Sequence, residues 1–231
     1  MARKRPVILV SFSGIDGAGK STQIEALHKR LTDARMHVTV FSMWDDIVVA
    51  PQVRESLSRA AFGGDQGVGS PENPLERRDK NVGAWPMQFF RFLLYFADAV
   101  SLSFKVRSLK ARGREDVAIF DRYIYDELAN LPLEKPIPRM VAKFLLWLVP
   151  APEVAYIIDA VPEIARARKP EYPLDFLHTN RERYLALSAM ADAIVVVPSA
   201  SIPECESQVQ SMFSSRVLSS ERSRRLAPVG R

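Results

Sequence analysis

Short apolar runs and longer amphipathic stretches alternate along this chain. Five of the apolar runs are rich in β-branched residues, and they cover residues 7–12, 38–41, 116–120, 154–158 and 193–197. Continuous apolar runs of this length are typical of strands that are buried on both faces. The pattern therefore predicts five strands, paired for the most part in parallel.

The segments between these runs have the spacing of helices. In residues 20–34, Ile24, Leu27 and Leu31 recur on one helical face, and the segment 85–112 has an unusually broad apolar face. Further helices are expected over 53–62, 138–148, 162–170, 175–190 and 203–213. Strands that alternate with helices predict an α/β fold, with a mostly parallel five-stranded sheet and helices on both of its faces.

Two segments depart from this pattern. Residues 63–84 are dense in turn formers and charges, which predicts a flexible insertion. Residues 214–231 are rich in serine and arginine and poor in apolar side chains, which predicts a disordered basic tail. The folded domain is therefore expected to comprise residues 1–213.

Charge and composition narrow the range of partners. The chain has 231 residues, of which 47% are hydrophobic, and a net charge of +5. Residues 1–6 carry +3 and residues 214–231 carry +4, so the body between them carries −2. Basic charge confined to the ends argues against a nucleic-acid-binding groove, and no apolar run reaches the length of a membrane span. We therefore expect neither nucleic-acid nor membrane partners.

The chain has a single cysteine, Cys205. One cysteine excludes an internal disulfide and fits a reducing compartment. We therefore expect a cytoplasmic location.

A glycine-rich motif joins the first expected strand to the first expected helix. Residues 14–21 read Gly-Ile-Asp-Gly-Ala-Gly-Lys-Ser, which fits the phosphate-binding P-loop pattern G-x-x-x-x-G-K-[ST]. Its glycines let backbone N–H groups point at phosphate oxygens, and the helix adds the positive end of its dipole. Lys20 is expected to reach the β- and γ-phosphates of ATP, and Ser21 to hold Mg²⁺. The predicted ATP-binding residues are Gly14, Asp16, Gly17, Ala18, Gly19, Lys20, Ser21 and Thr22. The motif and its context predict a P-loop NTPase fold, with ATP and Mg²⁺ as cofactors.

A second charged motif, Asp121-Arg122-Tyr123, directly follows the third expected strand. Arg122 can bind a phosphate through two parallel hydrogen bonds. Asp121 can hold Mg²⁺ or orient Arg122. Alternatively, the two charges form an ion pair that caps the next helix.

A cationic segment follows the fourth expected strand. Residues 162–174 contain Arg166, Arg168 and Lys169, and two prolines end the short helix that carries them. This composition favours a lid that closes and brings cations onto a transferring phosphate. Alternatively, the segment is a solvated helix whose C-terminal end favours cations.

Two further residues are candidates for contact with an acceptor. Trp44 follows the second expected strand, at the sheet edge where open α/β sheets bind ligands. Its ring can stack on a ligand or pack at the edge of the core. Arg91 lies in an apolar part of the long helix, where a charge is either paired or placed to meet a ligand.

Three motifs, in this order, resemble the thymidylate kinase family of P-loop nucleoside monophosphate kinases. The P-loop, with its acid at Asp16, is similar to that family's version. Residues 93–98 (Leu-Leu-Tyr-Phe-Ala-Asp) are similar to the helix that carries the family's base-stacking aromatic residue, and Asp121-Arg122-Tyr123 matches its DRY motif. The resemblance spans roughly residues 6–213.

The resemblance implies roles for the matching positions. Asp16 would contact the sugar 3′-hydroxyl of the acceptor or help to organise its phosphate, Tyr95 would stack on the base, and Arg122 would bind the acceptor phosphate. The predicted catalytic residues are then Lys20, Arg122, Arg166, Arg168 and Lys169. The predicted acceptor-binding residues are Asp16, Trp44, Arg91, Tyr95, Arg122 and Tyr123, and the predicted Mg²⁺ ligands are Ser21 and Asp121. Because members of the family often form dimers through the helix that spans 85–112 here, the resemblance also implies a homodimer.

The acceptor side of the site departs from the family pattern. Ala99 stands where the family usually has an arginine that binds thymine, and Trp44-Asp45-Asp46 replaces its Glu-Pro-Gly-Gly turn. The Ser and Gln that follow the DRY motif in the family are replaced by residues 125–127 and Asn130. We expect Mg-ATP-dependent transfer of the γ-phosphate to a small-molecule acceptor, a nucleoside monophosphate, with dTMP as the default. The alternatives are a kinase of the same fold that acts on a nucleoside or a non-nucleotide metabolite, and a nucleotide-binding module without catalysis.

Overall fold

The computed structural model describes residues 6–48 and 85–226. The helix expected over 53–62 and the insertion expected over 63–84 lie outside the described residues. Within the described helices, none is both long and apolar enough to cross a membrane.

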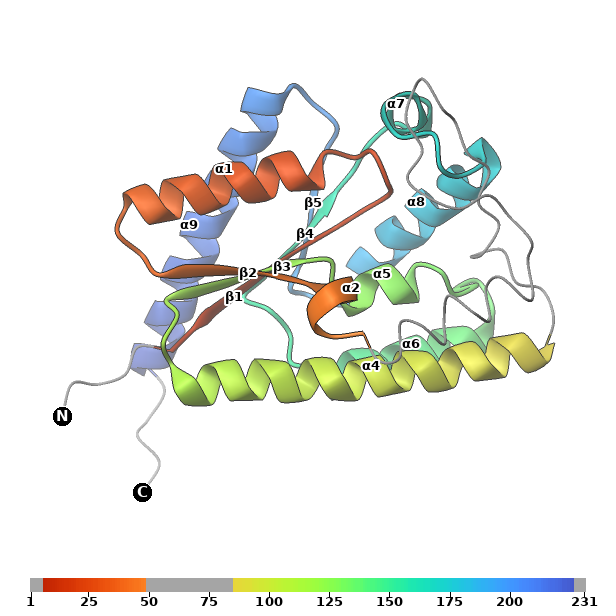
Figure 1. Ribbon diagram of the computed structural model, residues 1–231, viewed down its shortest axis with the longest axis horizontal. Coiled ribbons are helices and arrows are strands. Elements are labelled where there is room, and N and C mark those ends of the chain that lie inside the picture. The colour runs from red at the N-terminus through yellow and green to blue at the C-terminus, as the bar shows by residue number, and fades with distance from the viewer. Residues whose placement is uncertain (1–5, 49–84, 227–231) are drawn as a thin grey trace.

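A five-stranded sheet forms the centre of the described fold, in the order β2-β3-β1-β4-β5 (Figure 1). The strands are β1 (Ile8–Ser13), β2 (Val38–Ser42), β3 (Val117–Asp121), β4 (Val154–Ile158) and β5 (Ile194–Val197). All four pairings among these strands are parallel. The predicted α/β class and five-stranded sheet are confirmed, and the described sheet is wholly parallel.

Helices cover both faces of this sheet (Figure 1). α1 (Lys20–Asp33) packs against α9 (Ile202–Leu226) on one face, whereas α4 (Trp85–Arg112) and α6 (Pro136–Leu148) pack together on the other. The other described helices are α2 (Met43–Asp46), α5 (Ile124–Leu128), α7 (Pro162–Arg168) and α8 (Leu174–Ser188). These four lie toward the carboxyl ends of the strands, where a ligand site is expected in this class of fold.

The long helix α4 has the predicted bounds, and its apolar side chains divide into two rows. One row faces the core at helical spacing and consists of Tyr95, Ala99, Leu102, Val106 and Leu109. The other row is exposed and consists of Phe89, Leu93, Phe96 and Phe104. The broad apolar face predicted for this helix is therefore only partly covered by the described residues.

The last helix, α9, continues beyond the predicted boundary at residue 213 and ends at Leu226. The prediction of a disordered tail was therefore wrong for residues 214–226. Val217 packs against the core, and Nη2 of Arg216 donates a hydrogen bond to the carbonyl of Asp192 at 3.3 Å. These contacts continue the packing of α9 along the described fold although the segment is poor in apolar residues.

Candidate active site

The P-loop begins at the end of β1, which is held between β3 and β4 in the middle of the sheet. Two of its glycines have positive φ and close neighbours: a Cβ on Gly14 would lie 2.5 Å from the Ile158 carbonyl oxygen, and one on Gly17 would lie 2.2 Å from that of Ala165. Only glycine fits at such positions. Gly19 also has a positive φ, but nothing lies within 4 Å of its would-be Cβ. The backbone at Gly19 is therefore open to a ligand.

Lys20 is the first residue of α1 and lies at the mouth of this loop. Its Nζ donates hydrogen bonds of 2.9 Å to the carbonyl oxygens of Gly14 and Ile15. Burial, and secondarily the charge of Arg122, lower the pKa of Lys20 to about 8. The amine is therefore held beside the loop, and most of it is charged at neutral pH.

Ser21 and Thr22 follow Lys20 in the first turn of α1, and both are exposed. Ala18 closes the preceding turn, because its N–H donates to the carbonyl of Ile15 at 3.2 Å. The structure thus places the predicted ATP-binding residues along one continuous loop and helix start, as the motif requires.

Asp121 ends β3, and its Cα is the register partner of Phe12 at the end of β1. It therefore lies beside the P-loop, as predicted. Burial raises the pKa of Asp121 above its ordinary value, although the positive charges of Arg122 and Lys20 oppose that shift. No group of three or more His, Cys, Asp or Glu residues gathers into a metal site within residues 6–48 and 85–226. A hydroxyl from Ser21 and a carboxylate from Asp121 are donors that suit Mg²⁺, which usually keeps several waters and phosphate oxygens as ligands.

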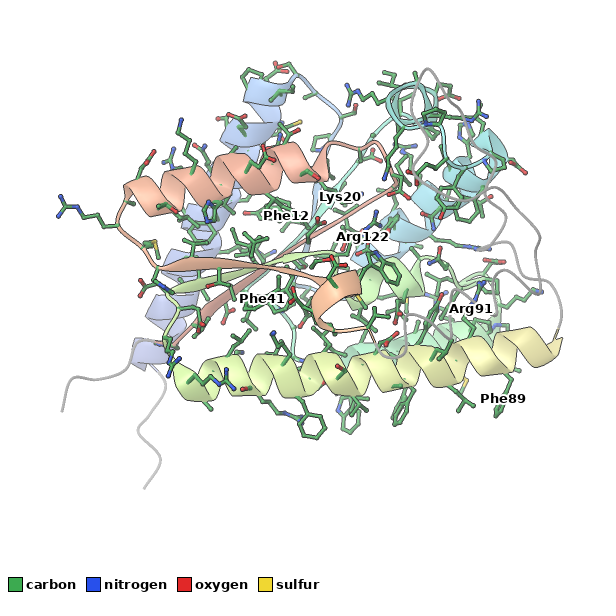
Figure 2. The ribbon with its side chains drawn as sticks, in the orientation of Figure 1. Phe12, Lys20, Phe41, Phe89, Arg91 and Arg122 are labelled. Atoms are coloured by element: carbon green, nitrogen blue, oxygen red, sulfur yellow. The ribbon has the colours of Figure 1, made fainter. Side chains whose placement is uncertain are left out.

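Arg122 lies between two carboxylates, near Lys20 at the centre of Figure 2. Its guanidinium forms an ion pair with Asp16 of the P-loop through Nη2 and with Asp126 of α5 through Nη1, at 3.2 Å to Oδ1. Burial disfavours the charge of this group, but Asp16 and Asp126 outweigh burial and raise the pKa of Arg122 above its ordinary value. Arg122 therefore lies beside the P-loop, and its two ion pairs link the P-loop to the first turn of α5.

Asp126 is the site residue that was not predicted from the sequence. Its side chain is buried, and it accepts hydrogen bonds from Ser13 Oγ at 2.6 Å, Tyr123 N at 3.0 Å and Tyr184 OH at 2.8 Å, besides Arg122. The i,i+4 spacing of Arg122 and Asp126 is a local signal that would have indicated their pairing. Nothing in the sequence near position 126 points to Tyr184, which is 58 residues away along the chain.

The structure places the side chain of Tyr123 in the core, and not with the other residues predicted to bind the acceptor. Its ring is buried and packs edge-on against Phe120 at a centroid distance of 5.4 Å, and its hydroxyl donates to the carbonyl of Pro150 at 2.6 Å. The chain turns at Arg122, whose φ is +69°. The two neighbouring side chains of the DRY motif therefore separate: Arg122 lies in the site, and Tyr123 packs in the core.

The three other residues predicted on the acceptor side lie on α2 and α4. Trp44 is partly exposed on α2, Tyr95 is buried on α4, and Arg91 is half-buried. Figure 2 shows Arg91 on the side of α4 that faces Arg122, whereas Phe89 projects from the opposite side. The structure therefore brings Arg91 toward the site end of the sheet and leaves the exposed row of α4 outside it.

The predicted lid cations lie on and just after α7, which packs directly on the P-loop through the buried Ala165 beside Gly17. Arg166 donates from Nε to the carbonyl of Tyr172 at 3.1 Å, and Lys169 Nζ lies 3.1 Å from Glu171 Oε1. Arg168 is exposed. The lid segment is thus next to the phosphate loop, while two of its cations contact the lid's own chain.

No protein-family model matches the chain. It is 33% identical to a probable thymidylate kinase of Pyrobaculum aerophilum over 189 residues, which cover 78% of this chain and 82% of the relative. The chain belongs to the thymidylate kinase family.

Other thymidylate kinases and one solved structure are also similar to the present chain. A probable thymidylate kinase of Archaeoglobus fulgidus is 24% identical over 217 residues, which cover 90% of this chain and 95% of the relative. A thymidylate kinase of Bifidobacterium longum subsp. infantis is 26% identical over 193 residues, with coverages of 79% and 74%. The thymidylate kinase structure from Candida albicans superposes with a TM-score of 0.61 at 16% identity, covers 91% of this chain and 92% of its own, and shows the same fold. The present chain is therefore a thymidylate-kinase-like phosphotransferase.

Proposed function

We propose that this enzyme transfers the γ-phosphate of Mg-ATP to the phosphate of a nucleoside monophosphate, with dTMP as the first candidate acceptor. The observation that carries the proposal is the ion pair between Arg122 and Asp16, which joins the DRY motif to the P-loop beside Lys20. Phosphoryl transfer between two anions requires positioned cations more than a strong base. A cationic centre at the junction of the two motifs is suited to that task.

On the donor side, residues 14–22 would hold the phosphates of ATP. The open backbone at Gly19 supports this role, because a phosphate can approach its N–H without a steric clash. Lys20 would exchange its two carbonyl contacts for phosphate oxygens. Ser21 and Asp121 would hold Mg²⁺, which neutralises phosphate charge when it is bound.

On the acceptor side, Arg122 would bind the acceptor phosphate and Asp16 would help to place the acceptor. An oxygen of the acceptor phosphate then forms a bond to the γ-phosphorus, while the bond from that phosphorus to the bridging oxygen of ADP breaks. Arg166, Arg168 or Lys169 would stabilise the transferring group once the lid segment closes. The packing of α7 against Gly17 supports this placement of the lid.

The base of the acceptor would lie between α2 and α4, with Tyr95 as the stacking residue and Arg91 and Trp44 as further contacts. Ala99 is fully buried on α4, and its methyl side chain has neither a donor nor an acceptor for a hydrogen bond to a base. A buried pocket that lacks such a bond loses selectivity. The absence of an arginine at position 99 therefore favours one alternative specifically, a kinase of the same fold with a different acceptor.

We also propose that the enzyme is a cytoplasmic homodimer. The exposed row of α4 is continued on α6 by Ile137, Met140, Phe144 and Trp147. Rings on the two helices already contact each other, since Phe96 and Phe144 stack at a centroid distance of 6.3 Å. A contiguous apolar surface of this kind is suited to a second copy of the chain, whose corresponding row would cover it.

The experiment that tests the function is ADP release from Mg-ATP against a panel of acceptors. The panel contains dTMP, the other nucleoside monophosphates, nucleosides and several sugars, and wild type is measured beside Lys20→Ala. Lys29→Ala is the matched control, because Lys29 lies on the same helix and is exposed. We expect turnover with dTMP in wild type and in Lys29→Ala, and loss of turnover in Lys20→Ala. Turnover with another class of acceptor would show that the substrate is not dTMP. ATP binding without turnover on any acceptor would show that the protein is a nucleotide-binding module without catalysis.

A further inference from the structure

One buried carboxylate beside the proposed phosphate site takes no direct part in the chemistry described above. We propose that Asp126 is a positioning residue that holds the guanidinium of Arg122 ready for the acceptor phosphate, and that Tyr184 of α8 fixes this carboxylate. The inference rests on the proposed function, because it requires that Arg122 meets a phosphate.

Asp126 connects three separate parts of the fold. Ser13 reaches it from the end of β1, the backbone of Tyr123 from the turn after β3, and Tyr184 from α8. The side chain of Asp126 is 1% exposed, so solvent cannot replace these donors. A buried carboxylate with this many donors is fixed in place, and so is the group that pairs with it.

The two carboxylates that flank Arg122 differ in their access to solvent. The side chain of Asp16 is 10% exposed, against 1% for Asp126, and it lies on the P-loop itself. An incoming phosphate competes for the guanidinium where the site is open, which is the side of Asp16. The contact between Nη1 of Arg122 and Asp126 lies deeper and remains. Asp126 thus keeps the planar guanidinium of Arg122 oriented while the other edge of that guanidinium exchanges Asp16 for the phosphate.

Asp126 also stabilises the backbone on which Arg122 is displayed. The φ of +69° at Arg122 is unfavourable for a residue with a side chain. The N–H of Arg122 donates to the carbonyl of Phe12 at 2.9 Å, and the next N–H, that of Tyr123, donates to Asp126 at 3.0 Å. These two bonds fix the turn on both sides of its strained residue.

Tyr184 is suited to hold the carboxylate at any pH at which the enzyme works. Burial, and then the negative charge of Asp126, raise the pKa of Tyr184 well above its ordinary value. Its hydroxyl therefore stays protonated and donates to Asp126 Oδ1. The same carboxylate oxygen receives Arg122 Nη1, so loss of the tyrosine hydroxyl acts on Arg122 through one shared atom.

The test compares Asp126→Asn and Tyr184→Phe with Tyr156→Phe. Tyr156 is the matched control, because its buried hydroxyl donates to the carbonyl of Val209 at 2.8 Å, away from the site. We expect Asp126→Asn to raise the KM for dTMP about tenfold or more, the loss typical of a hydrogen bond to a charged group. Tyr184→Phe should raise it by less, Tyr156→Phe should leave it unchanged, and the KM for ATP should stay within about twofold in all three.

A double variant separates positioning from general destabilisation. If Tyr184 acts through the carboxylate, Tyr184→Phe in the D126N background should add almost nothing to the KM for dTMP, whereas independent effects would multiply. Equal KM values for Tyr184→Phe and Tyr156→Phe, or parallel increases in the two KM values for ATP and dTMP, would overturn the proposal. If Asp126→Asn does not fold, the comparison of the KM for dTMP between Tyr184→Phe and Tyr156→Phe decides, because only Tyr184→Phe should raise it.

A readout that is independent of turnover distinguishes this inference from the proposed function. The side-chain ¹⁵N NMR signals of Arg122 report rotation of its guanidinium, which the paired carboxylates restrict in wild type. Asp126→Asn should average the Nη signals, and Tyr156→Phe should not. If wild type turns over no acceptor, the proposed function fails, and the NMR result still decides whether Asp126 holds Arg122. Unchanged Nη signals in Asp126→Asn would refute the inference even in an active enzyme.

Discussion

Replacing Gly17 by alanine tests the contact between the P-loop and α7. The new Cβ would lie 2.2 Å from the Ala165 carbonyl oxygen, so α7 must retreat by about 1.2 Å to reach an ordinary contact of 3.4 Å. Alanine at the positive φ of Gly17 costs roughly 1–2 kcal/mol, and the overpacking adds roughly 1–3 kcal/mol. We therefore expect Gly17→Ala to lower the free energy of unfolding by roughly 2–5 kcal/mol.

Gly19→Ala is the matched variant for this measurement. Its φ of +94° is similar to the +83° of Gly17, but nothing lies within 4 Å of the added Cβ. It should therefore lose only the conformational part, about 1–2 kcal/mol. Urea unfolding followed by circular dichroism gives both values. Equal losses in the two variants would refute the reasoning, because they would show that α7 does not rest on the loop at Gly17.

Three further predictions concern pH, the C-terminal helix and the apolar surface. Because burial lowers the pKa of Lys20 to about 8, its amine loses charge as the pH rises through that value, and kcat/KM for ATP should fall above it; a flat profile to pH 10 would contradict this. In the unfolded chain Lys20 keeps its proton up to the ordinary pKa of 10.5, whereas in the folded protein it loses the proton near pH 8. The free energy of unfolding should therefore rise with pH between these two values. Deletion of residues 216–231 removes the contacts of Arg216 and Val217, so it should lower the free energy of unfolding by about 1–3 kcal/mol. The KM values for ATP and the acceptor should not change. An unchanged unfolding curve would show that this segment does not stabilise the fold. Trp147→Glu should convert a dimer to a monomer in sedimentation measurements, whereas Ile202→Glu, at an exposed apolar site on α9, should not, and a monomeric wild type would exclude the homodimer.

The parts of the fold that follow from local pattern were predicted well. The five strands were found because strands of a parallel sheet, covered on both faces, are continuous apolar runs. The bounds of α4 followed from a long helical period that begins near Pro86, which is tolerated in a first turn. The P-loop was placed correctly because its spacing fixes the turn and the helix start together.

The parts that depend on distant contacts were not predictable in the same way. The DRY motif does not reveal that Tyr123 turns into the core, because its direction depends on the left-handed backbone at Arg122. Asp126 lies on a five-residue helix, which is too short to show a period, and Tyr184 reaches it from a different element. The extension of α9 beyond residue 213 lies in a segment whose composition alone resembles a tail, and local pattern does not reveal the tertiary contacts of Arg216 and Val217.

The attachments of α8 determine where a lid can move. Tyr184 ties this helix to Asp126, and Asn180 donates to the carbonyl of Ala129 at 2.9 Å. Arg181 makes two hydrogen bonds, of 2.6 and 2.7 Å, to the carboxylate of Asp159 after β4. Because α8 is fastened along this length, it belongs to the rigid body of the enzyme. Pro170 and Pro173 fix φ at two positions between α7 and α8, so the lid movement proposed above would be a short local rotation and not a swing of a whole domain.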